Sequence, residues 1–93
     1  MKEVSKIIAM ARMVNGSSDF GTCKSIDKPI SQAMFAKFRE DCVKHYLKIE
    51  QEDILYYTLR VKVKKDGKWI DENFKAKNFS EFLKSLDKAG EIV

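Results

Sequence analysis

The residues of this chain best suited to chemistry are two cysteines and a single histidine. Cys42 and His45 have the Cys-x-x-His spacing that places two side chains one turn apart on a helix. A structural zinc ion needs four ligands, and only Cys23 is a further strong candidate. His45 also falls within the expected core arc of that helix, where a hydrogen-bonded histidine is the commoner occupant. We therefore expect no metal site and no cofactor.

Two other arrangements could support catalysis or cation binding. Cys23 and His45 would form a nucleophile–base pair if the segment around Cys23 folded over the helix. Nothing near Cys23 in the sequence supplies an oxyanion hole. The acids Glu50, Glu52 and Asp53 offer oxygen ligands, but they lack the spacing and glycine of an EF-hand loop. The sequence therefore predicts a protein that is not an enzyme.

Length and composition indicate one globular domain over residues 1–93. The chain is 44% hydrophobic and contains one proline and four glycines. Its start lacks the apolar core of a signal peptide, and no stretch approaches the roughly 20 apolar residues that span a bilayer. Two cysteines are too few for a disulfide scaffold. We expect a cytoplasmic protein without a membrane partner.

The N-terminal third is predicted to be a helix followed by a loop. Apolar residues at helical spacing favour a helix over residues 2–14; they are Val4, Ile7, Ile8, Ala11 and Val14. Asn15-Gly16 would end it, because both residues tolerate the left-handed conformation. Residues 15–28 are expected to form a long irregular loop, with a short strand at 20–26 as an alternative.

A second helix is predicted over residues 29–49, capped by Asp27 or Ser31. One apolar stripe faces the core: Met34, Phe35, Phe38, Cys42, Tyr46 and Ile49. A second stripe consists of Ala36, Val43 and Leu47. The first helix could cover this second stripe, or it could serve self-association or a partner protein.

The period then changes to two, which predicts a strand over residues 54–65. Asp66-Gly67 is a strong hairpin turn signal. The implied register pairs Val63 with Ile70, Leu59 with Phe74 and Tyr57 with Ala76 on the core side. The same register places Glu72 opposite Val61, so we expect a bulge or a partly open edge there.

A last helix is predicted from Phe79 to about Ala89. Asn78 and Glu81 form a variant of the capping box, and Gly90 is expected to end the helix. The element order is then ααββα. The sequence thus predicts a small α+β fold with two N-terminal helices, an antiparallel hairpin (with a third short strand from 15–28 as an option) and a C-terminal helix.

The excess charge lies in the hairpin. Residues 54–77 contain seven basic and three acidic residues, whereas the remainder has eleven of each sign. On the outer side Lys64 lies opposite Trp69, and Lys62 lies opposite Asp71. The candidate binding residues are Tyr56, Arg60, Lys62, Lys64, Trp69, Lys75 and Lys77.

Three interpretations of this outer surface remain open. It could be an ordinary solvated face with a Lys62–Asp71 ion pair and a Lys64–Trp69 cation–π contact. It could bind a protein with an acidic surface, with Trp69 and Arg60 as the main anchors. It could also bind nucleic acid, because basic residues neutralise phosphates and exposed rings stack on bases.

The leading hypothesis is a small non-enzymatic binding protein that acts through protein–protein interaction as an accessory factor, regulator or inhibitor. The alternative is a nucleic-acid-binding module that uses the same basic strip. A homodimer through Ala36, Val43 and Leu47 is a third possibility. No segment carries the motif of a named family. Small size without a catalytic motif is typical of phage and mobile-element accessory proteins.

Overall fold

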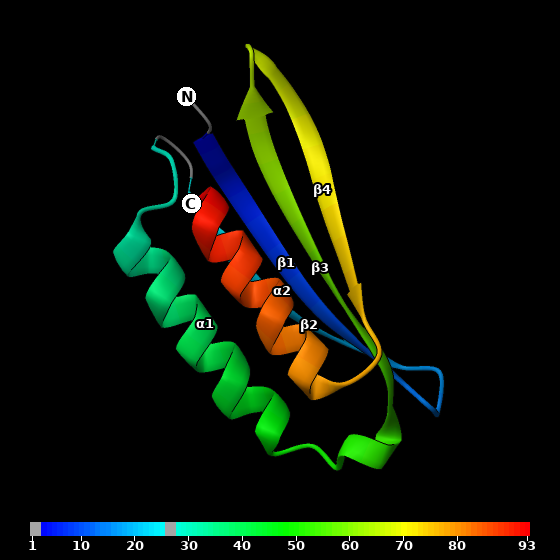
Figure 1. Cartoon of the computed structure of the whole chain (residues 1–93). Coiled ribbons are helices and arrows are strands. Elements are labelled where there is room, and N and C mark those ends of the chain that lie inside the picture. Colours follow the sequence, from blue (N-terminus) through cyan, green and yellow to red (C-terminus); the bar gives the residue numbers. More distant parts are fainter. Residues whose placement is uncertain (1–2, 26–27) are drawn as a thin grey trace.

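A four-stranded antiparallel sheet with two helices on one side forms the structure, a computed structural model that describes residues 3–25 and 28–93 (Figure 1). The described elements follow the order β-β-α-β-β-α. The strands are β1 (Glu3–Met13), β2 (Ser18–Lys24), β3 (Ile54–Lys65) and β4 (Lys68–Ala76). The helices are α1 (Gln32–Leu47) and α2 (Phe79–Ile92), and a 3₁₀ turn (Gln51–Asp53) precedes β3. The predicted order of two N-terminal helices, a hairpin and a last helix is wrong, although the fold does mix helices with antiparallel strands.

The strand order is β2-β1-β3-β4, so the β1–β2 hairpin and the β3–β4 hairpin form one continuous sheet. Each half of the chain is a hairpin followed by a helix, and the first strands of the two hairpins, β1 and β3, pair at the centre. An isolated hairpin is marginally stable in water, so this central pairing is what makes each hairpin part of a stable sheet.

The helix predicted over residues 2–14 is instead the central strand β1, and a β-bulge explains the error. The register with β3 shifts between Val4 and Lys6, so Val4 and Ile7 both face the core although they are three residues apart. That spacing imitates the period of a helix. Apolar residues on the other face of β1, Ile8 and Met10, also hide the alternation expected of a strand.

The segment predicted as a loop forms a hairpin with β1. Asn15-Gly16 is a turn between strands and not a helix end: Gly16 has a φ of 91°, and the Asn15 side chain accepts a hydrogen bond from the Ser17 amide at 2.9 Å. The short strand allowed for at 20–26 is β2, at Ser18–Lys24.

The β3–β4 hairpin has the predicted register. Asp66 and Gly67 both have positive φ, at 52° and 78°, as a type I′ turn requires. Pairing runs from Tyr57–Ala76 to Lys65–Lys68 without a shift, so there is no bulge at Glu72, and the partly open edge, the other expectation, is confirmed. Because β4 is an edge strand, Glu72 is only half-buried and its carboxylate keeps contact with water.

Both helices begin at side-chain caps that the sequence indicates. Ser31 accepts a hydrogen bond from the Met34 amide, and Asn78 accepts one from the Glu81 amide. Asp27, the other predicted cap, lies outside the described residues. Because Ser31 is its cap, the helix predicted over 29–49 begins at Gln32, and it ends at Leu47. The helix predicted to end near 89 continues to Ile92.

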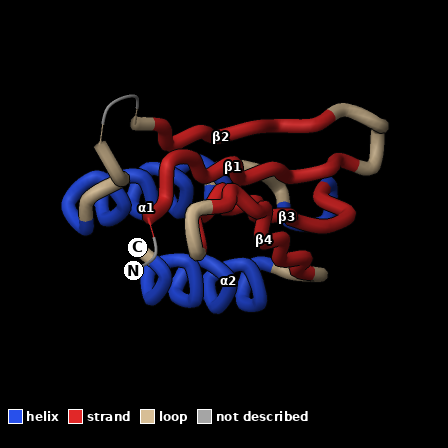
Figure 2. Tube along the Cα trace, turned by 90° about the horizontal axis from the view of Figure 1, so that it is seen from above, coloured by secondary structure: helices blue, strands red, loops and turns tan. Residues whose placement is uncertain are grey.

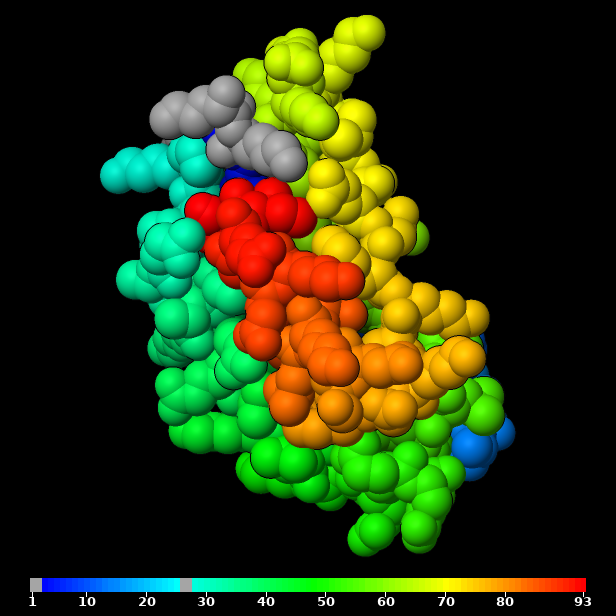
Figure 3. Space-filling model, viewed as in Figure 1, coloured from blue at the N-terminus to red at the C-terminus, as the bar shows by residue number. Residues whose placement is uncertain are grey.

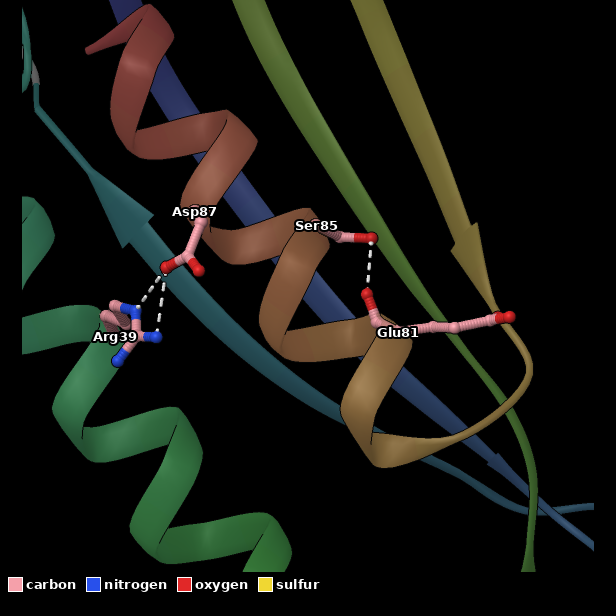
Figure 4. A network of polar contacts seen from close by, with 4 residues as sticks. All are labelled: Arg39, Glu81, Ser85 and Asp87. Atoms are coloured by element: carbon pink, nitrogen blue, oxygen red, sulfur yellow. Dashed lines mark hydrogen bonds and ion pairs between the residues drawn. The ribbon is translucent and has the colours of Figure 1, made fainter.

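The two helices lie side by side and cover one face of the sheet (Figure 2). Arg39 on α1 donates two hydrogen bonds to Asp87 on α2, at 3.0 and 3.2 Å (Figure 4). The buried Ser85 hydroxyl donates to the Glu81 carbonyl of its own helix, which satisfies it without a partner from the core.

Aromatic rings fill the space between helices and sheet. Tyr57 of β3 stacks on Phe82 of α2, with ring centroids 4.6 Å apart. Tyr46 of α1 meets both rings edge-on at 5.6 and 5.5 Å. The three rings join the sheet and both helices, and all are at most 1% exposed.

Gly90 lies inside α2 and does not end it. A Cβ at this position would be 2.9 Å from the Phe35 ring of α1, closer than real carbon contacts allow. Glycine is therefore needed for the close approach of the two helices.

We predict that Gly90→Ala lowers the free energy of unfolding by about 1 kcal/mol, because overpacking costs more than the improved helix propensity gains. Urea denaturation would measure the change. In a Phe35→Leu background the same substitution should cost much less, since the obstructing ring is gone. An equal cost in both backgrounds would contradict this role of Gly90.

Candidate functional site

The face of the sheet opposite the helices is open, and we call it the open face. The helices lie on one side only, as Figure 2 shows. Residues that pair across an antiparallel ladder point to the same face, so the register identifies its members. All four strands contribute side chains to it. Figure 3 shows the other, helix-covered side, beyond which the tip of the β3–β4 hairpin projects.

Three lysines lie side by side across three strands of the open face. Lys6 of β1 pairs with Lys24 of β2 on one side and with Lys62 of β3 on the other. We call Lys24, Lys6 and Lys62 the lysine row. Cβ atoms of facing residues are about 4.5–5.5 Å apart, and like charges at that distance destabilise a sheet. Asp71 of β4 faces Lys62 and offsets part of this repulsion, so the row costs stability chiefly at Lys6 and Lys24 unless a further anion compensates it.

All the excess positive charge of the chain lies on this face. Among the strand residues that the register assigns to it, seven are basic and two, Glu3 and Asp71, are acidic; the basic ones are Lys6, Arg12, Lys24, Arg60, Lys62, Lys64 and Lys75. The remainder of the chain has eleven basic and twelve acidic residues. The open face is thus the positively charged side of a molecule that is otherwise close to neutral.

The described ion pairs lie elsewhere. They join Arg39 to Asp87 and Lys44 to Glu40, and the imidazole of His45 contacts the Asp19 carboxylate. The ion pair expected between Lys62 and Asp71 is not among the pairs found in residues 3–25 and 28–93, although the two residues face each other across the ladder.

Beside the lysine row the open face has an apolar floor, made of Ile8, Met10 and Phe20. Phe20 of β2 pairs with Met10 of β1, and its side chain is 63% exposed. The floor lies in a hollow of about 440 Å³ whose rim includes Arg60, Asn73 and Lys75. Arg60 Nε donates to Asn73 Oδ1 at 3.2 Å, which holds a guanidinium and an amide together at the rim.

Two further aromatic rings on this face make cation–π contacts with lysine side chains. The Lys75 ammonium lies 4.4 Å from the centre of the Tyr56 ring, and that of Lys64 lies 5.9 Å from the Trp69 ring. The expected Lys64–Trp69 contact is therefore present. Trp69 is 46% exposed, and Ile70 on the opposite side of the projecting hairpin tip is 42% exposed.

The structure brings most of the predicted binding residues together. Tyr56, Arg60, Lys62, Lys64, Trp69 and Lys75 share the open face, and Lys77 follows the last residue of β4. Sequence reasoning missed Lys6, Arg12, Lys24 and Phe20, because it placed them in a helix and a loop. Asn15-Gly16 was the signal that could have found them, since this dipeptide also favours a hairpin.

The stripe proposed for self-association does not form a continuous exposed surface. Val43 is half-buried against the core, whereas Ala36 and Leu47 are exposed. With residues 3–13 in the sheet, no N-terminal helix covers these positions. Self-association stays a prediction.

The candidate chemical groups lie at the β2–α1 edge, on the helix side of the sheet, where Phe20 also borders their cavity. His45 is exposed, contrary to expectation, and its Nε2 lies 2.8 Å from Asp19 Oδ2. The pair borders a cavity of about 270 Å³ that Cys42 also lines. Among the described residues no group of three or more histidine, cysteine, aspartate or glutamate side chains is arranged to hold a metal ion.

Both cysteines are buried, unpaired thiols. Burial, with a smaller contribution from the nearby Asp41 carboxylate, raises the pKa of Cys42 to about 12. Burial also raises the pKa of Cys23. The thiolate is the reactive form, so neither residue has the environment of a nucleophile at neutral pH.

Comparison with known proteins gives no relative from which a function could be transferred. No family model, no curated protein and no solved structure matches this chain. None of the described helices has the length and apolar character needed to cross a bilayer. Function must therefore be inferred from the residues of the open face themselves.

The raised pKa of Cys42 predicts a loss of stability in alkaline solution. Below pH 9 the thiol is protonated in both the folded and the unfolded chain, so the folded state keeps its full advantage. As the pH rises from 9 towards 12, the unfolded chain releases its proton first, and this favours unfolding. Between pH 8 and pH 10.5 the contribution of Cys42 to the loss should be at most about 2 kcal/mol.

Urea denaturation of the wild type and Cys42→Ala at both pH values would measure this contribution. The variant should be less stable at pH 8, because it has a cavity, but should lose less stability on going to pH 10.5. The buried phenols of Tyr46 and Tyr57, whose pKa values burial also raises, would still contribute in both proteins. Equal losses in the two proteins would contradict the role of Cys42.

Proposed function

We propose that this protein is a nucleic-acid-binding module that uses the open face of its sheet. The observation that carries the proposal is the lysine row. Lys24, Lys6 and Lys62 repel one another, and a phosphate backbone would turn that repulsion into attraction. Arg60 extends the basic surface next to the row, because a hollow of about 120 Å³ is bordered by Lys6, Arg60 and Lys62, with Asp71 as its one acidic side chain.

The composition of the face supports nucleic acid over an ordinary solvated surface. A solvated sheet face normally mixes charges of both signs, so that facing residues attract. Here seven basic residues stand against two acidic ones. Exposed rings also lie among the basic residues, a combination that binds both phosphates and bases.

A protein partner with an acidic surface, the leading hypothesis from sequence, stays untested. Nucleic acid takes precedence because the pairing of β1 with β2 and β3 adds Lys6, Arg12 and Lys24 to the predicted strip without adding more than one acid, Glu3. The absence of enzymatic activity and a cytoplasmic location remain predictions as well.

The proposal predicts salt-sensitive binding of oligonucleotides that depends on the lysine row. Fluorescence anisotropy with labelled DNA and RNA between 50 and 200 mM salt would measure it. Lys24→Gln/Lys62→Gln should weaken binding and lower the slope of log K against log salt by about 1.5, because two phosphate contacts are lost. Both substituted side chains are exposed, so the variant should remain folded.

The matched control is Lys37→Gln/Lys84→Gln, which removes the same charge from exposed positions on α1 and α2. It should bind almost as the wild type does. Equal weakening in both variants would show that only net charge matters. No binding at 50 mM salt would overturn the proposal and would favour an acidic protein partner instead.

A further inference from the structure

The apolar floor is the part of the open face that phosphate binding leaves unexplained. Phosphates need cations, whereas Ile8, Met10 and Phe20 offer no charge and no polar group. Phe20 is 63% exposed, more than any other large hydrophobic side chain among the described residues. Together with Ile8 and Met10 this ring forms a contiguous apolar patch within a basic surface, which suits an apolar or aromatic ligand.

The rim of the hollow supplies polar groups that match a flat heterocycle. The Arg60 guanidinium uses Nε to bond Asn73, so its two terminal nitrogens remain available as donors. The Asn73 amide nitrogen can donate and its oxygen can accept. Arginine and asparagine are the side chains that most often form paired hydrogen bonds with the edges of guanine and adenine.

The shape of the sheet favours an unpaired strand over a duplex. Four strands at about 4.8 Å spacing are roughly 14 Å wide before side chains are added, whereas the major groove of B-DNA is about 12 Å wide and admits two strands. In a duplex the base faces are also stacked on one another. Only an unpaired base can offer its face to Phe20.

We infer that the hollow on the open face is a binding site for one unpaired nucleobase of a single-stranded nucleic acid. The base stacks on Phe20 above Met10 and Ile8, with its edge towards Arg60 and Asn73. The flanking phosphates contact the lysine row on one side and Lys75 on the other. This inference rests on the proposed function, since it names the form of nucleic acid that the same face selects.

Anisotropy titrations with a labelled 12-nucleotide strand and with the matching duplex test the inference, each as DNA and as RNA. We expect the single strand to bind at least tenfold more tightly than the duplex at equal salt. Phe20→Ala should weaken single-strand binding about fivefold or more, because one base–aromatic stack is lost, and should leave the salt slope unchanged. Comparison of the DNA and RNA strands identifies which sugar the face accepts.

The control is Leu47→Ala, which truncates a side chain of similar exposure, 60%, on α1. It should leave affinity unchanged. Equal binding of duplex and single strand, or a Phe20→Ala affinity within twofold of the wild type, would overturn the base site. If that binding still required the lysine row, the proposed function would stand. No binding of any oligonucleotide would overturn both.

Discussion

The antiparallel ladder between β1 and β3 holds the two halves of the molecule together. Each half of the chain is a hairpin with a helix, and neither hairpin could bury an apolar face alone. Pairing of the two first strands joins the hairpins and places α1 and α2 on the same side of one sheet. The aromatic cluster of Tyr46, Tyr57 and Phe82 then closes over that side. One consequence is unavoidable: with both helices on one side, the other side of the sheet is left for solvent or a ligand.

The same ladder decides the chemistry of the open face. Because β1 lies at the centre, Lys6 has a lysine on each side, and Ile8 and Met10 lie in the middle of the face with Phe20 beside them. The most reactive side-chain types in the sequence, Cys42 and His45, lie instead at the helix-covered edge, where burial keeps the thiol protonated. Binding by the sheet surface therefore explains more of the structure than catalysis at a side-chain cluster.

The second half of the fold and the helix α1 could be predicted from sequence, whereas the β1–β2 hairpin could not. Strict alternation and Asp66-Gly67 defined the β3–β4 hairpin and its register residue by residue. In β1 the bulge at Ser5 placed Val4 and Ile7 on one face at helical spacing, and apolar residues on the open face removed the alternation. Local pattern cannot reveal a bulge, because the shift exists only relative to the partner strand. Because the β1–β2 hairpin was not predicted, its part of the candidate site was not predicted either. The sequence indicated Tyr56, Arg60, Lys62 and Trp69, but not Lys6, Lys24 and Phe20.

Lys6→Met allows the cost of the lysine row to stability and its contribution to binding to be measured on one variant. This change keeps a long unbranched side chain and removes only the central charge of the lysine row. If the row is maintained for a phosphate ligand at the cost of stability, the free energy of unfolding of the variant should be about 0.5 kcal/mol higher than that of the wild type. The variant should also bind oligonucleotides several-fold more weakly at 50 mM salt. Lys37→Met on α1 should change neither property. A Lys6→Met protein that is less stable than the wild type, or that binds as tightly, would contradict the account.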